Sequence, residues 1–384
     1  MFPKMTKSPI RLGISLRATT CTSAEGLLPV VCFVLLCFGL LARAQQPNEP
    51  TASAKANPAS GTANTAITLD VAVTNQSGQA VPDLQGQDFT LLDNKQPQKI
   101  TSFAAEGRPN DAGDSSTQVV LLLDQVNTPV QRMRIARQEL EKYLKGQTQL
   151  AQPTSILFFS DSGAAATKAT KDPNALLAEL QKNPQPLPNR RVAQGEYGAV
   201  ERFNSSLRTL GQLANFYSQT PGHKVVVWIG SGWAFLSSPR IDISHKDQQT
   251  FFSTIISLST ALRQARITLY QVDPIGSGGL GREYYKAFIK PITSPRQIEG
   301  GGNLALQVFA YQSGGLVINS SNDLAGEIGK CIAEAQSFYS LTFDAAPSDS
   351  ANEYHALEVK VSRAGLTART RSGYYAQPEP PSSR

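Results

Sequence analysis

Residues 119–124 read Val-Val-Leu-Leu-Leu-Asp, five apolar side chains in succession followed by one carboxylate. Four more runs, at 156–159, 225–229, 267–272 and 316–318, also barely alternate between apolar and polar residues. Strands of this composition are typically buried on both faces, as in a parallel sheet between two layers of helices. The five runs therefore predict the strands of one buried sheet.

The segments between these runs repeat apolar residues every three or four positions, which is typical of a helix with one buried face. The repeat is clear over 133–143, 200–217, 252–262 and 324–335. Strand and helix alternate in this way over about 220 residues. The alternation predicts an α/β fold with a doubly wound, mostly parallel sheet of the Rossmann-like type.

Segments with strand-like, period-two alternation flank this region on both sides. They are expected at 67–73, 88–93 and 98–103 before it, and at 337–343, 357–361 and 366–375 after it. The N-terminal set spans roughly 40 residues, which is below the size that usually folds alone. We therefore expect the N- and C-terminal strands to form one small β-sandwich-like lobe, with the α/β domain inserted between them.

The first 44 residues have the three parts of a Sec-type signal peptide. A basic stretch ends at Arg17, an apolar run covers 26–41, and Ala42-Arg43-Ala44 supplies the small residues that a signal peptidase requires. We expect cleavage after Ala44 and export to the periplasm or the medium. An uncleaved membrane anchor is the alternative.

The sequence thus divides into six predicted parts. They are a signal peptide (1–44), a disordered leader (45–64), an N-terminal β module (65–106), the α/β domain (117–336), C-terminal β strands that pack with the N-terminal module (337–376) and a disordered tail (377–384). The leader and the tail have almost no large apolar side chains, so they cannot bury enough surface to offset the entropy cost of ordering.

The composition favours a folded chain and argues against a nucleic-acid binder. Of the 384 residues, 40% are hydrophobic and 17% are charged, which is enough apolar material for a sizeable core. The formal net charge is +6, but residues 1–44 hold five basic residues and one acidic residue. The other 340 residues carry a net charge of only +2, which is an ordinary surface and not a phosphate-binding one.

Cys331 is the one thiol expected in the mature protein, because Cys21, Cys32 and Cys37 leave with the signal peptide. No intramolecular disulfide can then form. Cys331 falls on the apolar face of 324–335, so we expect it to act as a small buried hydrophobic residue. A catalytic thiol, the alternative, would need a nearby histidine, and the sequence proposes none.

Four motifs follow one another along the chain. They are Val81–Thr90 (VPDLQGQDFT), Leu121–Thr128 (LLLDQVNT), Tyr270–Asp273 (YQVD) and Arg371–Ala376 (RSGYYA). In this order and spacing they resemble the VWFA-related proteins of acidobacteria, over about residues 65–376. The resemblance implies a von Willebrand factor A (vWA)-like domain that binds proteins, or mediates cell adhesion, through loops at the carboxyl ends of its strands.

In the wider vWA family, the same strand ends hold Mg²⁺ in a metal-ion-dependent adhesion site. Asp124 and Thr128 match the family's first aspartate and second hydroxyl, but Val126 replaces the first hydroxyl. The later aspartate and threonine of the family are also absent, at 230–232 and 194–197. Because Mg²⁺ prefers six hard oxygen ligands, we expect a degenerate site with no cofactor, where Asp124 caps a loop through backbone N–H groups. A functional Mg²⁺ site is the alternative.

A few residues at this end of the sheet are candidates for contact with a partner. They are Asp124, Asn127, Thr128, Ser231 and Trp233. Trp233, together with 235–236, either packs beneath its loop or forms an exposed contact patch. The basic residues between 132 and 145 are most simply a solvated helix face, with an anionic partner as the alternative.

Catalytic motifs are weak in this sequence. Residues 276–281 match Gly-x-Gly-x-x-Gly, but Pro274 follows the preceding strand, so we expect a surface loop and no dinucleotide site. Ser231 is outside any Gly-x-Ser-x-Gly motif, and no acid and histidine follow in the order of a hydrolase. The histidines are widely spaced and show no metal-ligand pairing: His223, His245 and His355.

The sequence therefore predicts an exported, non-catalytic protein of the vWA type that acts in protein binding or adhesion. We do not expect an enzyme, a nucleic-acid partner or, in the mature form, a membrane-embedded segment, and we expect a monomer. The protein partner is not identified by the sequence. A Mg²⁺-dependent adhesin and an exported hydrolase are the two alternatives.

Overall fold

The computed structural model describes eight stretches of the chain. They are residues 66–106, 117–183, 195–233, 244–274, 283–298, 301–319, 321–345 and 348–378. The predicted signal peptide, the leader and the linker after residue 106 lie outside these stretches, as do the last six residues.

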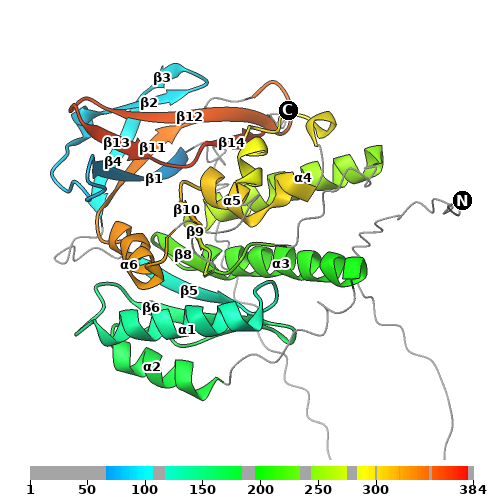
Figure 1. The fold of residues 1–384 in the computed structure, drawn as a ribbon. Coiled ribbons are helices and arrows are strands. Elements are labelled where there is room, and N and C mark those ends of the chain that lie inside the picture. Colours follow the sequence, from blue (N-terminus) through cyan, green and yellow to red (C-terminus); the bar gives the residue numbers. More distant parts are fainter. Residues whose placement is uncertain are drawn as a thin grey trace, which may run out of the picture. The chain divides into compact units, whose positions relative to one another are not determined.

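A six-stranded sheet, in the order β10-β9-β8-β5-β6-β7, forms the centre of the α/β part (Figure 1). Its strands are β5 (Gln118–Asp124), β6 (Thr154–Ser160), β7 (Gly163–Ala166), β8 (Lys224–Ile229), β9 (Ile267–Val272) and β10 (Val317–Ile318). Five of them run parallel, and β7 pairs antiparallel with β6. Every residue of β8 and β9 is buried, as expected for strands covered on both faces. The predicted fold class is confirmed.

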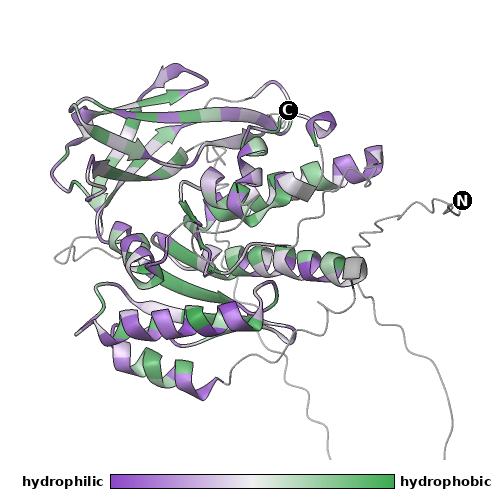
Figure 2. Cartoon of the chain, viewed as in Figure 1, coloured by the Kyte–Doolittle hydropathy of each residue, from purple (hydrophilic) through white to green (hydrophobic). Residues whose placement is uncertain are grey.

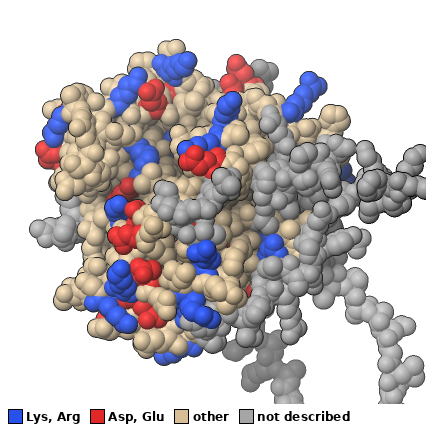
Figure 3. All heavy atoms as spheres, viewed as in Figure 1, with Lys and Arg blue, Asp and Glu red and all other residues tan. Residues whose placement is uncertain are grey.

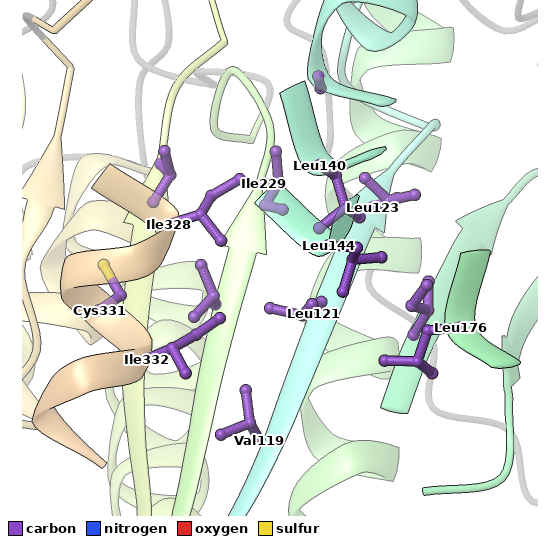
Figure 4. Close-up of a cluster of buried hydrophobic side chains, with 14 of the residues drawn as sticks. Val119, Leu121, Leu123, Leu140, Leu144, Leu176, Ile229, Ile328, Cys331 and Ile332 are labelled. Atoms are coloured by element: carbon purple, nitrogen blue, oxygen red, sulfur yellow. The ribbon is translucent and has the colours of Figure 1, made fainter. Parts of the chain in front are cut away.

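Helices cover both faces of this sheet (Figure 1). The first face carries α1 (Val130–Lys145), α2 (Pro173–Lys182) and α6 (Leu324–Glu334), and the second carries α3 (Gly195–Ser218), α4 (His245–Gln264) and α5 (Leu306–Gln312). Leu121 and Leu123 share one apolar core with α1, α2 and α6 (Figure 4). Trp228 belongs to the second face, where its ring meets Trp233, which in turn contacts Phe309 of α5.

Side-chain caps fix where several of these helices begin. Ser244 Oγ accepts a hydrogen bond from the backbone N–H of Asp247, and the Asp247 carboxylate accepts one from the backbone N–H of Ser244, so α4 starts with a capping box. Asp172 caps α2 immediately before Pro173, and Asp323 caps α6. Four short 3-10 helices complete the helical elements of the described residues: η1 (Gly86–Asp88), η3 (Tyr284–Ala287), η4 (Pro295–Gln297) and η5 (Gly301–Leu304).

Two four-stranded antiparallel sheets form a second lobe, ordered β13-β1-β11-β4 and β14-β12-β2-β3. Their strands are β1 (Ala66–Asn75), β2 (Phe89–Asp93), β3 (Gln96–Gln98), β4 (Ile100–Glu106), β11 (Phe338–Asp344), β12 (Glu353–Val361), β13 (Leu366–Arg369) and β14 (Gly373–Ala376). Inward side chains of both sheets, such as Leu69, Leu91 and Leu341, share one core. Figure 2 shows the resulting alternation of apolar and polar residues along these strands.

The segment 366–375 differs from the single strand that its alternation predicts. Its two halves are β13, which pairs with β1, and β14, which pairs with β12 in the other sheet. The second half begins at Gly373. A larger residue would not fit there, because a Cβ would lie 2.3 Å from the Tyr354 hydroxyl oxygen. The chain therefore changes sheets at 370–372, and β7, α2 and α5 are further elements that the sequence patterns did not predict.

The surface is mixed in charge. On the face shown in Figure 3, lysines and arginines are interspersed with aspartates and glutamates. The basic side chains of α1 include Lys142 and Lys145, which pair with glutamates of the same helix, so this helix face carries both signs. Among the described residues, no helix combines the length and the apolar character that a membrane crossing requires.

Replacing Cys331 with serine is expected to lower the free energy of unfolding by about 1–3 kcal/mol, because the new hydroxyl would be buried without a partner. Cys331 is 1% exposed in the core beneath α6. Urea unfolding measures the change. Ala333→Ser places the same hydroxyl on the exposed side of α6 and should cost no more than about 0.5 kcal/mol. Equal losses in the two variants would contradict the burial of Cys331.

Candidate functional site

The strand order of the six-stranded sheet reverses next to β5. The chain passes from β5 outward to β6 and then returns to the other side of β5 as β8. In open parallel sheets, ligands bind outside the carboxyl ends of the strands at such a reversal. Asp124 ends β5, Gly230 follows β8 and its N–H donates to the carbonyl of Val272 at the end of β9. Asp124, Ser231 and Asp273 thus lie along one edge, called the carboxyl edge below.

Asp124 is fully buried at this edge and is surrounded by donors. Its Oδ1 accepts hydrogen bonds from the backbone N–H groups of Val126 (3.0 Å) and Asn127 (2.9 Å). Its Oδ2 accepts from Asn127 Nδ2 and from Trp228 Nε1, both at 2.9 Å. Asn127 Nδ2 also donates to Ser206 Oγ on α3. The carboxylate therefore closes its own turn and ties that turn to β8, while Asn127 carries the connection on to α3.

These contacts leave a poor site for a cation. Both carboxylate oxygens of Asp124 face N–H groups, whose positive ends repel a metal ion, and Val126 offers no ligand atom where a hydroxyl would stand. Burial raises the pKa of Asp124, and the hydrogen bonds from Asn127, Trp228 and the turn backbone lower it part of the way back. Among the described residues, no three acidic, histidine or cysteine side chains cluster as metal ligands would. The described residues around Asp124 do not fit Mg²⁺.

Thr128 and Ser231 meet across the edge. The backbone N–H of Ser231 donates to Thr128 Oγ1 at 3.1 Å. The approach is close because residue 230 is glycine: a Cβ there would lie 2.8 Å from the Cβ of Asp124 and 2.9 Å from Thr128 Oγ1. The hydroxyl oxygen of Thr128 thus takes a backbone hydrogen bond, as an ordinary loop-closing residue does.

Ser231 has no hydrogen-bonded base among the described residues. Its Oγ is buried and has no hydrogen-bond partner among the described residues. His223 bonds Thr268 near the start of β8, at the opposite edge of the sheet, and His355 pairs with Asp93 in the β lobe. Neither histidine is placed to accept the hydroxyl proton of Ser231.

Trp233 lies in the core. It is 5% exposed, and its ring packs against Trp228 (5.6 Å between centroids) and Phe309 (6.1 Å), with Phe203 of α3 on another side. Its role in the described residues is therefore packing. The neighbouring residues 235–236 and the glycine motif at 276–281 lie outside the described residues.

Sequence reasoning missed the donors and amides that complete this edge. The sequence pattern included Trp228 only as one apolar residue of a buried strand, although its Nε1 donates a hydrogen bond to Asp124. Gln271 donates to the carbonyl of Gly230 at 2.6 Å, and Gln307 lies against Gly232. A glutamine within a buried apolar strand was the one available indication, because a buried amide requires polar partners.

Comparison with known proteins yields structural matches only. No protein-family model and no curated protein matches this chain. An aerotolerance-related membrane protein from Bacteroides fragilis matches at 12% identity and a TM-score of 0.33, over 57% of this chain and 98% of that one. The SpRpn10 VWA domain matches at 10% identity and a TM-score of 0.28, over 56% of this chain and 93% of that one. The manganese-loaded TRAP protein of Plasmodium vivax matches at 9% identity and a TM-score of 0.33, over 71% of this chain and 97% of that one.

These matches include a VWA domain, the kind of domain that the sequence motifs resemble. Identities of 9–12% and TM-scores of 0.28–0.33 concern the fold alone and do not bear on what this chain binds. The α/β class of this chain rests on its own strand order and burial.

Replacing Asp124 with alanine is expected to lower the free energy of unfolding by about 2–4 kcal/mol, because Trp228 Nε1 and the turn N–H groups would lose their acceptor while buried. Urea unfolding followed by tryptophan fluorescence measures the loss. Asp349→Ala removes a carboxylate from an exposed position and should change stability by less than about 0.5 kcal/mol. A loss at Asp124 no larger than at Asp349 would show that the carboxylate does not support the turn.

Proposed function

We propose that this chain is an exported, non-catalytic protein-interaction module of the vWA type, which contacts a protein partner through its carboxyl edge. The observation that carries the proposal is the use of Asp124. Its carboxylate, at the position where vWA domains of the resembled family hold a metal, is occupied by four donors of its own chain. We take the site to be a degenerate adhesion site that works through surface complementarity without a metal.

The surroundings of the other polar groups support the non-catalytic part of the proposal. Ser231 Oγ has no hydrogen-bond partner among the described residues, and Cys331 is buried in the core, where burial raises the pKa of its thiol. A thiol with a raised pKa is a poor nucleophile at neutral pH. The export part rests on the sequence pattern of residues 1–44.

Calorimetric titration with Mg²⁺ and Mn²⁺ separates this proposal from a metal-dependent adhesin. We expect no saturable heat from either ion, because the donors around Asp124 oppose a cation. Micromolar binding that Asp124→Ala or Thr128→Val abolishes would overturn the degenerate site and favour the metal-dependent alternative.

Photo-crosslinking tests which edge binds a protein. Ser162 and Ala151 are both exposed and lie beyond opposite ends of β6. A photoreactive phenylalanine at position 162, on the carboxyl edge, is expected to capture a defined protein from the envelope fraction of the source bacterium. The same group at position 151 should not capture it. Equal capture from both positions, or capture from position 151 alone, would contradict an interface at the carboxyl edge.

A further inference from the structure

A small pocket opens where the β lobe meets the second helical face of the α/β part. Its wall combines Ser259 and Leu262 of α4, the end of α5 with Gln312 and Ser313, Tyr354 of β12, and residues 371–373 and 375. Figure 1 shows α4, α5 and β14 beside one another at this junction. Residues of the RSGYYA motif at 371–376 thus line the pocket, and the motif has no part in the carboxyl edge.

Arg371 is the charged residue of this pocket, and it is 8% exposed. Its guanidinium forms no ion pair and no hydrogen bond with any described residue. The carboxylate that attracts it, Asp70, is already paired with Arg266. Two nearby arginines do form ion pairs, Arg266 with Asp70 and Arg369 with Glu334. A buried cation without a counter-charge is costly.

A second arginine adds to the positive charge. Arg263 lies one helical turn beyond Ser259 on α4, is partly buried and likewise pairs with no carboxylate of the described chain. Burial, and then the charge of Arg263, lower the pKa of Arg371 from 12.5 to about 10. Both effects would be relieved by a negative charge in the pocket.

The pocket also offers a hydroxyl without a partner. Ser259 Oγ is buried and makes no hydrogen bond to any described residue, and its residue lines the pocket. The Tyr354 hydroxyl, at 3.2 Å from Ser372 Oγ, lies on the same wall. A guanidinium and a free hydroxyl are both donors, and none of the described residues that line the pocket carries a carboxylate. Such a set selects an anion.

We infer that this pocket binds one small monovalent anion, chloride or the carboxylate of an acetate-sized acid, between Arg371 and the hydroxyl of Ser259. The size of the pocket limits the size of the anion that it can hold. Its volume is about 20 Å³, and a water-sized particle needs roughly 10–15 Å³. One chloride ion or one carboxylate oxygen fits this volume.

Titration of the full chain with chloride tests the site, with sodium gluconate as the bulky reference anion that holds the ionic strength constant. Chlorine NMR line width reports exchange of chloride with a protein site, and calorimetry repeats the titration with acetate. We expect saturable chloride binding and competition by acetate. Saturable binding of either anion to the wild-type chain is required, and its absence for both would overturn the inference.

Two variants locate the anion. Arg371→Gln is expected to weaken the affinity at least about tenfold, because it loses a charge-assisted hydrogen bond. Ser259→Ala is expected to weaken it about fivefold, since one neutral hydrogen bond is lost. The matched controls are Ser253→Ala and Arg208→Gln, at exposed positions of α4 and α3, and both should bind as the wild type does.

Circular dichroism establishes that each variant is folded. If Arg371→Gln does not fold, Ser259→Ala decides the question alone, because it removes one oxygen atom from a partly buried position. Wild-type affinity in Ser259→Ala, or in folded Arg371→Gln, would place any bound anion elsewhere and overturn the inference. The metal titrations and crosslinks at the carboxyl edge are independent of these results.

Discussion

The pairing of β1 on both of its sides constrains the whole fold. β1 lies between β11 and β13, and both neighbours come from the C-terminal part of the chain. Leu69 and Val71 reach complete burial only when these later strands are in place. The α/β part must therefore leave the lobe after β4 and return to it at β11, so that the two parts share one junction. Residues 63–384 accordingly form one compact unit.

The junction is held by polar contacts that the topology makes possible. Arg266, which follows α4, pairs with Asp70 of β1, and Thr370 donates to the carbonyl of the same Asp70. Arg369 pairs with Glu334 at the end of α6. Partly buried pairs of this kind contribute orientation more than net stability, because desolvation offsets most of their attraction. They fix how the segment 369–373 crosses from one sheet to the other, which brings Arg371 to its pocket.

Sequence patterns predicted the layers because strands buried on two faces contain uninterrupted apolar runs, as β5 does over 119–123 and β8 over 225–229. They could not predict β7, whose four residues are small and exposed and depend on pairing with β6. At the carboxyl edge, the position of Asp124 followed from the end of a strand. Its partner Trp228 did not, since that contact depends on which strand lies beside β5, and strand order is a long-range property.

One rule, that a buried charge must be satisfied, gives opposite results at the two polar sites. Asp124 receives hydrogen bonds on both oxygens from residues of its own turn and of the neighbouring strand β8, so its negative charge is used within the fold. Arg371 is almost as deeply buried but receives nothing from the described chain. Its charge remains available to a molecule from outside, and this is why we infer an anion site at the junction.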